Sequence, residues 1–145
     1  MAYREQYPPT HRNNPRRANG TLRTKNRERM KAEGRPCWIC KAFGRPAAID
    51  YSLTTYRDPR DGKTKRHPMS FELDEIIPVS KYWLGGYPTP EACANDYSNL
   101  DATHRCCNNW RKNKTREEVL AIALQARSGK KIRTAIKPVE QPMEF

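Results

Sequence analysis

The stretch Phe71-Glu-Leu-Asp-Glu-Ile-Ile-Pro-Val-Ser80 is the part of the chain from which the rest is best interpreted. Apolar and polar residues alternate up to Asp74, which predicts a short strand with one buried face. Asp74 and Glu75 are neighbours, so their side chains point to opposite sides if the strand continues through both. Adjacent acids are usually solvated surface. Here a cysteine pair precedes them and a His/Cys/Asn cluster follows, so both acids are candidates for a metal site.

Length and composition indicate one domain with a small core. The chain has 145 residues, of which 36% are hydrophobic, and it contains 7 Gly and 12 Pro. Cores of this size usually need a disulfide or a metal as an additional constraint. The 5 cysteines are odd in number, and a Cys-x-x-Cys is separated from a His-x-x-Cys. Both features favour zinc in a reducing compartment over a disulfide framework. No apolar run approaches the roughly 20 residues of a membrane span, so we expect a soluble, cytoplasmic protein with no membrane partner.

The charge of the chain predicts a polyanionic partner. Lys and Arg number 28 against 16 Asp and Glu, a formal net charge of +12. Nucleic acid is the simplest such partner, and a merely soluble basic surface is the alternative. Residues 1–20 are expected to form a disordered or loosely docked arm, and 21–33 a charged helix that ends at Gly34. The residues assigned to nucleic-acid binding are Arg16, Arg17, Arg23, Lys25, Arg111, Lys112 and Lys114.

Two ligand pairs with matched spacing predict a structural zinc site. A Cys-x-x-Cys on a tight turn aims both thiolates at one ion; a redox motif is the alternative, although no βαβ pattern surrounds it. A His-x-x-Cys lies in the segment 102–110, where a short helix would hold both residues within one turn. The predicted zinc ligands are Cys37, Cys40, His104 and Cys107, with Cys106 as the alternative to Cys107.

The remaining elements are predicted from local signals. Residues 47–56 alternate as a strand would, and an exposed turn follows before the strand that begins near Phe71. A helical turn is expected at 91–96 with Thr89 as its cap. The capping box Thr115-Arg-Glu-Glu118 starts a C-terminal helix, which ends at Ser128-Gly129.

Taken in order, these pieces resemble the HNH endonuclease family, especially its short phage-encoded members. The resemblance covers roughly residues 37–114, and five pieces in the right order are specific although no single one is. The matching pieces are Cys37-Trp-Ile-Cys40, Leu73-Asp-Glu-Ile-Ile-Pro78, Gly85-Gly86, Asn99-Leu100 and His104-Arg-Cys-Cys107-Asn108.

The resemblance implies a small α+β fold: a ββα-metal core with a structural zinc, flanked by helices and basic tails. The implied organisation is a basic N-terminal arm and helix (1–36), the nuclease domain (37–114), a helix packing on the core (115–129) and a basic flexible tail (130–145). The zinc would hold the hairpin loop and helix together, and a second, catalytic ion would lie on the opposite side.

The resemblance also assigns roles to single residues. Asp74 corresponds to the carboxylate that binds the catalytic Mg²⁺ or Mn²⁺, and Asn108 completes that site. Asn99 corresponds to the asparagine that orders the loop between strand and helix. Glu75 stands where the family has its general-base histidine, which is the departure. The ordinary pKa of Glu is roughly two units below that of His, although burial beside Asp74 could raise it; Glu75 could also bind the metal.

The implied activity is hydrolysis of DNA phosphodiester bonds, by nicking or double-strand cutting. The implied partners are double-stranded DNA and, in a phage packaging context, terminase or portal proteins; no residue of the chain carries that last inference. The alternative is a catalytically weak or inactive zinc module that binds DNA or a packaging protein.

Overall fold

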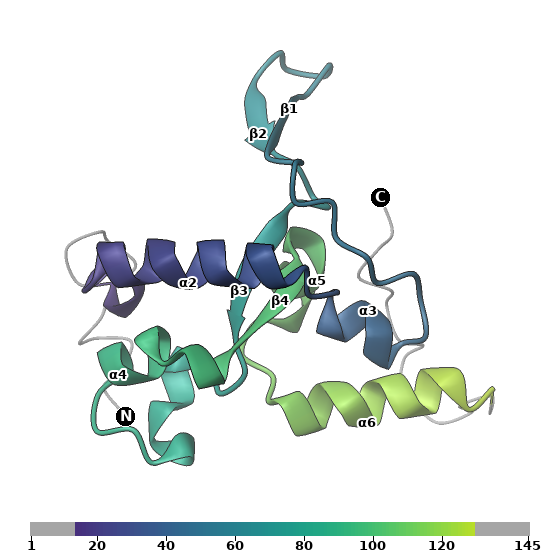
Figure 1. Ribbon diagram of the computed structural model, residues 1–145. Coiled ribbons are helices and arrows are strands. Elements are labelled where there is room, and N and C mark those ends of the chain that lie inside the picture. Colours follow the sequence, from purple (N-terminus) through teal and green to yellow (C-terminus); the bar gives the residue numbers. More distant parts are fainter. Residues whose placement is uncertain (1–13, 130–145) are drawn as a thin grey trace.

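A pair of strands and the helix that follows them form the centre of the fold. Residues 14–129 of the computed structural model are described here, and they form a small α+β arrangement with two separate two-stranded antiparallel sheets (Figure 1). Strand β3 (Phe71–Glu75) pairs with β4 (Leu100–His104), in a register that places Asp74 opposite Asp101. Helix α5 (Arg105–Arg111) begins directly after β4 and packs against both strands.

The other elements surround this centre. Helix α2 (Gly20–Glu33) passes along one side of it, and α6 (Arg116–Arg127) lies beyond the short helix α3 (Trp38–Ala42) (Figure 1). Between β3 and β4 the chain forms three short helical segments, which are η3 (Val79–Gly85), α4 (Pro90–Asn95) and η4 (Tyr97–Asn99). No helix in the described range 14–129 is both long and apolar enough to cross a membrane.

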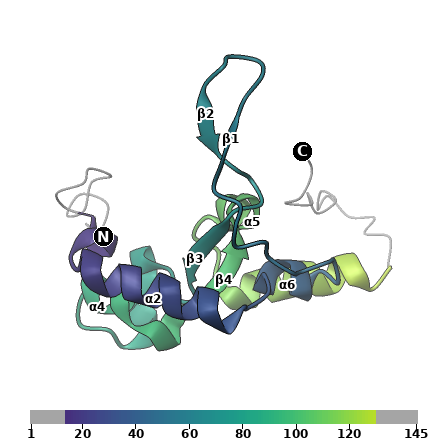
Figure 2. The same cartoon turned by 45° about the horizontal axis from the view of Figure 1, so that its top comes forward.

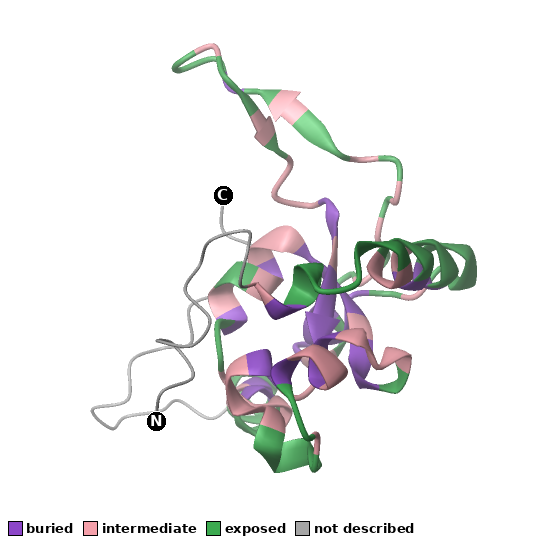
Figure 3. Ribbon diagram, turned by 90° about the vertical axis from the view of Figure 1, so that its left-hand side faces the viewer, coloured by how far each residue is buried: buried purple, intermediate pink, exposed green. Residues whose placement is uncertain are grey.

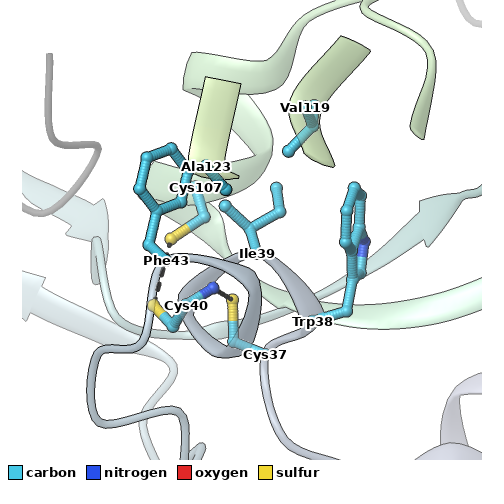
Figure 4. Packing of buried hydrophobic residues seen from close by; sticks show 8 residues of the cluster. All are labelled: Cys37, Trp38, Ile39, Cys40, Phe43, Cys107, Val119 and Ala123. Carbon is cyan, nitrogen blue, oxygen red and sulfur yellow. Dashed lines mark hydrogen bonds between the residues drawn. The ribbon is translucent and has the colours of Figure 1, made fainter. Parts of the chain in front are cut away.

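The buried apolar residues form three small clusters instead of one large core. In the largest, Phe43 and the residues of the Cys37–Cys40 turn pack against Val119 and Ala123 of α6 (Figure 4). A second lies between α2 and the β3–β4 pair, and a third lies under η3 and α4. Figure 3 shows the buried residues on the central strands and on parts of the helices around them. This division agrees with the small core expected from composition.

Predictions that rested on local capping signals are confirmed. Helix α2 ends at Gly34, which adopts the left-handed conformation (φ 64°) that favours glycine. The Thr89 side chain accepts from the backbone N–H of Ala92 at the start of α4. The capping box at the start of α6 is complete, since Thr115 and Glu118 each accept from the other's backbone N–H.

Two predicted boundaries are wrong, and both errors concern pairing between distant segments. Residues 102–104 are not helical: they belong to β4, where pairing with β3 buries Ala102 completely. The predicted strand at 47–56 is reduced to Thr55 and Tyr56, the start of β1 (Thr55–Arg57). Residues 47–54 have no partner strand; the carbonyl of Ala47 instead accepts from the backbone N–H of Cys37. Alternation without a pairing partner does not make a strand.

Strand β1 and β2 (Thr64–Arg66) form a hairpin that stands away from the rest of the molecule (Figures 1 and 2). At the N-terminal side, Pro15–Arg17 form the short helix η2, whose Arg16 is joined to Glu75 by hydrogen bonds. This part of the predicted arm is therefore docked on the body. Residues 1–13 of that arm and the predicted tail 130–145 lie outside the described residues.

Candidate metal centre and the acidic pocket

The four predicted zinc ligands come together in the structure. The ligand atoms of Cys37, Cys40, His104 and Cys107 all lie within 4.8 Å of one another, and all four residues are buried. The Sγ of Cys40 lies 3.4 Å from Nδ1 of His104 and 3.6 Å from Sγ of Cys107. Tetrahedral zinc with Zn–S bonds of about 2.3 Å separates neighbouring sulfurs by about 3.8 Å. The group could therefore hold one metal ion and is compatible with structural zinc, with Cys107 and not Cys106 as the fourth member.

Hydrogen bonds around the cluster suit a metal as well. The Sγ of Cys37 accepts from the backbone N–H groups of Cys40 (3.5 Å) and His104 (3.4 Å), which stabilises a thiolate. The Nε2 of His104 lies 3.3 Å from the carbonyl oxygen of Ala48. Donation from Nε2 to this carbonyl leaves the lone pair of Nδ1 directed toward the sulfurs, an arrangement typical of metal-bound histidine. The donor set and its surroundings thus fit zinc.

The location of the cluster explains what a metal would do for the fold. Cys37 is the N-cap of α3, His104 ends β4, and Cys107 lies in the first turn of α5. Figure 4 shows Cys40 and Cys107 beside Phe43, Cys37 next to Cys40, and Val119 and Ala123 of α6 above them. An ion at this point would join α3 to the junction of β4 and α5.

The residues predicted for a second metal ion line one pocket. Asp74 and Glu75 from β3 and Asn108 from α5 all contribute to the wall of a pocket of about 440 Å³, which we call the acidic pocket after its two carboxylates from the end of β3. The same wall carries the basic residues Arg16, Arg23 and Lys112. The pocket therefore combines oxygen ligands for a cation with guanidinium and ammonium groups for an anion.

Asp74 is held by two buried donors. Its side chain is 5% exposed, and its Oδ2 accepts from Nε1 of Trp38 (2.7 Å) and from Nη1 of Arg111. Its Oδ1 has no hydrogen-bond partner among residues 14–129. Burial raises the pKa of Asp74 to about 6, although Arg111 and Trp38 act in the opposite direction. One oxygen is thus fixed by the protein, and the other has capacity for a cation.

Glu75 is engaged through both of its oxygens. Its Oε1 accepts from Nη2 of Arg16 (2.8 Å) and its Oε2 from Nη1 of Arg23 (3.0 Å), and the residue is 5% exposed. Burial raises the pKa of Glu75, but the guanidiniums of Arg16 and Arg23 outweigh it and hold that pKa below its ordinary value. The possibility that burial would make Glu75 a stronger base is therefore wrong for this arrangement.

Asn99 does not line the pocket. It is buried, accepts from the backbone N–H of Ile77 (2.9 Å) and donates to the carbonyl oxygen of Cys93 (3.2 Å). These bonds fix the loop after β3 to the segment before β4. The geometry matches a loop-ordering asparagine, and Asn99 is not among the residues that line the pocket.

The residues predicted to bind nucleic acid are divided between surface and interior. Arg17, Lys25 and Lys112 are exposed, and Lys114 is half-buried with its Nζ over the ring of Trp110. Arg111 is only 1% exposed and donates to Asp74 and to the carbonyl oxygens of Glu75 and Ile76, which places it in the interior.

Sequence reasoning missed how three residues organise the pocket. Trp38, which was not singled out, and Arg111 orient Asp74, and Arg23 binds Glu75; both arginines had been predicted to contact nucleic acid. Their partners lie 36, 37 and 52 positions away, and no local pattern signals such contacts.

Comparison of the chain with protein-family models, curated proteins and solved structures finds no match. The functional argument therefore depends on the residues and distances given above.

Proposed function

We propose that this chain is a metal-dependent endonuclease of the HNH type, which hydrolyses phosphodiester bonds of DNA. The observation that carries the proposal is the meeting of Asp74 and Asn108 in one pocket, on a strand and a helix that belong to the strand–strand–helix unit β3–β4–α5. The zinc-compatible cluster lies at the β4–α5 junction of the same unit. This order of parts agrees with the ββα-metal core that the motif resemblance implies.

The ligand chemistry supports a hard divalent ion. A carboxylate oxygen of Asp74 and the amide oxygen of Asn108 are ligands that suit Mg²⁺ or Mn²⁺ with several waters retained. Such an ion, when bound, supplies charge stabilisation at the scissile phosphate and acidifies a bound water. Trp38 and Arg111 hold Oδ2 of Asp74, so the carboxylate orientation is set before substrate arrives.

The guanidinium groups of Arg16 and Arg23, which bind Glu75, can also bind a phosphate. A guanidinium fork binds carboxylate and phosphate with the same geometry. Arg16 and Arg23 line the pocket together with Glu75, so a backbone phosphate entering it would compete for their donors. In the proposed mechanism this exchange frees a Glu75 oxygen to accept a proton from the attacking water. Glu75 is then the general base and the two arginines bind substrate.

The second candidate function is a zinc module that binds DNA, or a packaging protein, without cutting. It is favoured by the same contacts, because both oxygens of Glu75 are occupied and its pKa is lowered. If the arginines remain on Glu75 when nucleic acid is present, the site has no general base.

Nicking of supercoiled plasmid by the zinc-loaded protein distinguishes the two candidates. With Mg²⁺ or Mn²⁺ the endonuclease proposal predicts conversion to nicked circles. Binding without cleavage under every divalent metal would identify the binding module.

Changing Glu75→His tests the base assignment. Imidazole has a pKa roughly two units higher than an ordinary glutamate, and it releases Arg16 and Arg23 for phosphate. We expect nicking to accelerate by about tenfold or more, a part of the roughly 10²–10⁴-fold that a positioned general base contributes. Glu72→His, on the same strand and in the same pocket wall, is the matched control and should give no gain. Equal rates for wild type and Glu75→His would remove Glu75 from the base position.

A further inference from the structure

The β1–β2 hairpin contributes no residue to the pocket of the proposed active site. It projects from the body, with Thr55 opposite Arg66, Tyr56 opposite Lys65, and Arg57 opposite Thr64 (Figures 1 and 2). No third strand of the described residues joins this sheet. Isolated two-stranded hairpins are marginally stable in water, so its persistence requires a specific turn.

That turn is built around the hairpin's own acidic residues. Asp58 is 1% exposed; it accepts from the backbone N–H of Arg60 (2.9 Å) and from Nζ of Lys65 (2.7 Å). The Nζ of Lys65 also lies 3.0 Å from a carboxylate oxygen of Asp61. Gly62 closes the turn in the left-handed conformation (φ 70°). Both acids are thus used within the turn, and the hairpin is a defined structure without support from a core.

The outward face of the hairpin is positive and polar. Residues 55–66 contain five Lys or Arg against two Asp. Strand alternation places Thr55, Arg57, Thr64 and Arg66 on one face, and all four are exposed. Within residues 14–129 the side chains of Arg57 and Lys63 have no hydrogen bond or ion pair. Donors of this kind on an uncovered ribbon are complementary to a polyanion.

The base of the hairpin is connected to the acidic pocket. Arg66 pairs with Glu72 at 2.7 Å, and Glu72 lies in the pocket wall with Asp74. At the base of the hairpin, Arg66 and Thr55 also line a second pocket, together with Arg27 and Lys31 of α2. A nucleic acid held over the acidic pocket would therefore meet basic side chains that continue into the hairpin.

We propose that the β1–β2 hairpin enters the major groove of duplex DNA, with Arg57 and Lys63 contacting the duplex. A two-stranded ribbon fits the major groove, which is about 12 Å wide, whereas the minor groove of about 6 Å is too narrow. At about 3.3 Å per residue the paired strands span roughly 10 Å, more than the groove depth of about 8.5 Å. Arginine and threonine are side chains that contact base edges there. Any inference about where the cleaved bond lies relative to the hairpin rests on the proposed function. The binding of the hairpin to duplex DNA does not.

The test uses the zinc-loaded full chain and fluorescence anisotropy with a labelled duplex and with one of its strands alone. The double variant Arg57→Ala with Lys63→Ala should weaken duplex binding by about tenfold and reduce the slope of log affinity against log salt by about 1 to 2. Its single-strand affinity should stay close to that of wild type. The matched control, Lys41→Ala with Lys81→Ala, removes the same charge away from the hairpin and should change duplex binding much less.

Two results would overturn the proposal. One is an equal loss of duplex affinity in both double variants, and the other is an equal loss on duplex and single strand, which would indicate charge alone. The exposed hairpin positions allow the variant to fold, and its zinc content and circular dichroism verify this. Because affinity is measured without cleavage, failure here leaves the endonuclease proposal standing if plasmid nicking still depends on Asp74.

Discussion

Arg111 determines the geometry of the acidic pocket at the level of single residues. Its guanidinium is buried and donates to Asp74 and to the carbonyl oxygens of Glu75 and Ile76. It thereby satisfies the backbone at the end of β3 and compensates a carboxylate that would otherwise be buried without a counter-charge. A buried pair of this kind is costly to break from one side, because the remaining charge has no partner.

Replacement of Arg111 by Met should lower the free energy of unfolding by about 3 to 5 kcal/mol, the range for removing one partner of a buried pair. Urea denaturation followed by circular dichroism measures this. Arg105→Met, on the same helix, is the matched control: its side chain is 35% exposed and lies 3.6 Å from Glu72. An exposed pair contributes less than about 1 kcal/mol. Similar losses for the two variants would contradict the role given to Arg111.

The sequence named Asp74 and Asn108 as candidates, and the structure places both in one pocket, but the residues that surround them could not be predicted. Asp74 became a candidate because a cysteine pair precedes its strand and a His/Cys/Asn cluster follows it, and its role came from the family resemblance. Arg111 was predicted to contact nucleic acid as one of several basic residues of a strongly basic chain. Its partner lies 37 positions away, and only the folded chain shows that the guanidinium turns inward.

At the level of elements, the cysteine and histidine cluster joins parts that are individually too short to be stable. Helix α3 has 5 residues and α5 has 7, below the length at which isolated helices form in water. Helices α2, α4 and α6 were predicted with good boundaries because their caps are encoded in adjacent residues. The start of β4 and the irregular segment 47–54 were predicted incorrectly, because strand pairing depends on residues far along the chain.

Removal of two ligands tests the metal centre directly. Native mass spectrometry of the full chain should show one zinc per molecule, and Cys37→Ser with Cys40→Ser should abolish it. The double variant should also unfold, since binding of structural zinc contributes folding free energy. Cys106→Ser is the matched control. Cys106 lies outside the four-residue cluster, so this variant should keep its zinc. Retention of zinc by the double variant would contradict the ligand assignment.

At the level of the whole molecule, a thin core supports a strongly basic surface. In residues 14–129 three small apolar clusters surround the β3–β4–α5 unit, Arg16 of η2 lines the acidic pocket, and the hairpin reaches it only through the Arg66–Glu72 pair. Composition predicted the small core and favoured a metal, and the structure shows a cluster that could hold one. Composition could not predict that Arg16 and Arg23 would lie on Glu75, because charge counts do not specify pairs. We propose that this arrangement places a metal-dependent hydrolytic site at Asp74.

Initial rates of plasmid nicking by the zinc-loaded wild type and by Asp74→Asn test the hydrolytic site at Asp74. Asparagine keeps an acceptor for Trp38 and Arg111, so the fold should survive better than with alanine, while the metal loses its charged ligand. Asp101→Asn, the cross-strand partner position, is the matched control. We expect nicking that requires Mg²⁺ or Mn²⁺ in wild type and Asp101→Asn, and a loss of about 100-fold or more, equivalent to roughly 2.7 kcal/mol, in Asp74→Asn. Nicking by Asp74→Asn at the wild-type rate, or no nicking by wild type under any divalent metal, would contradict it.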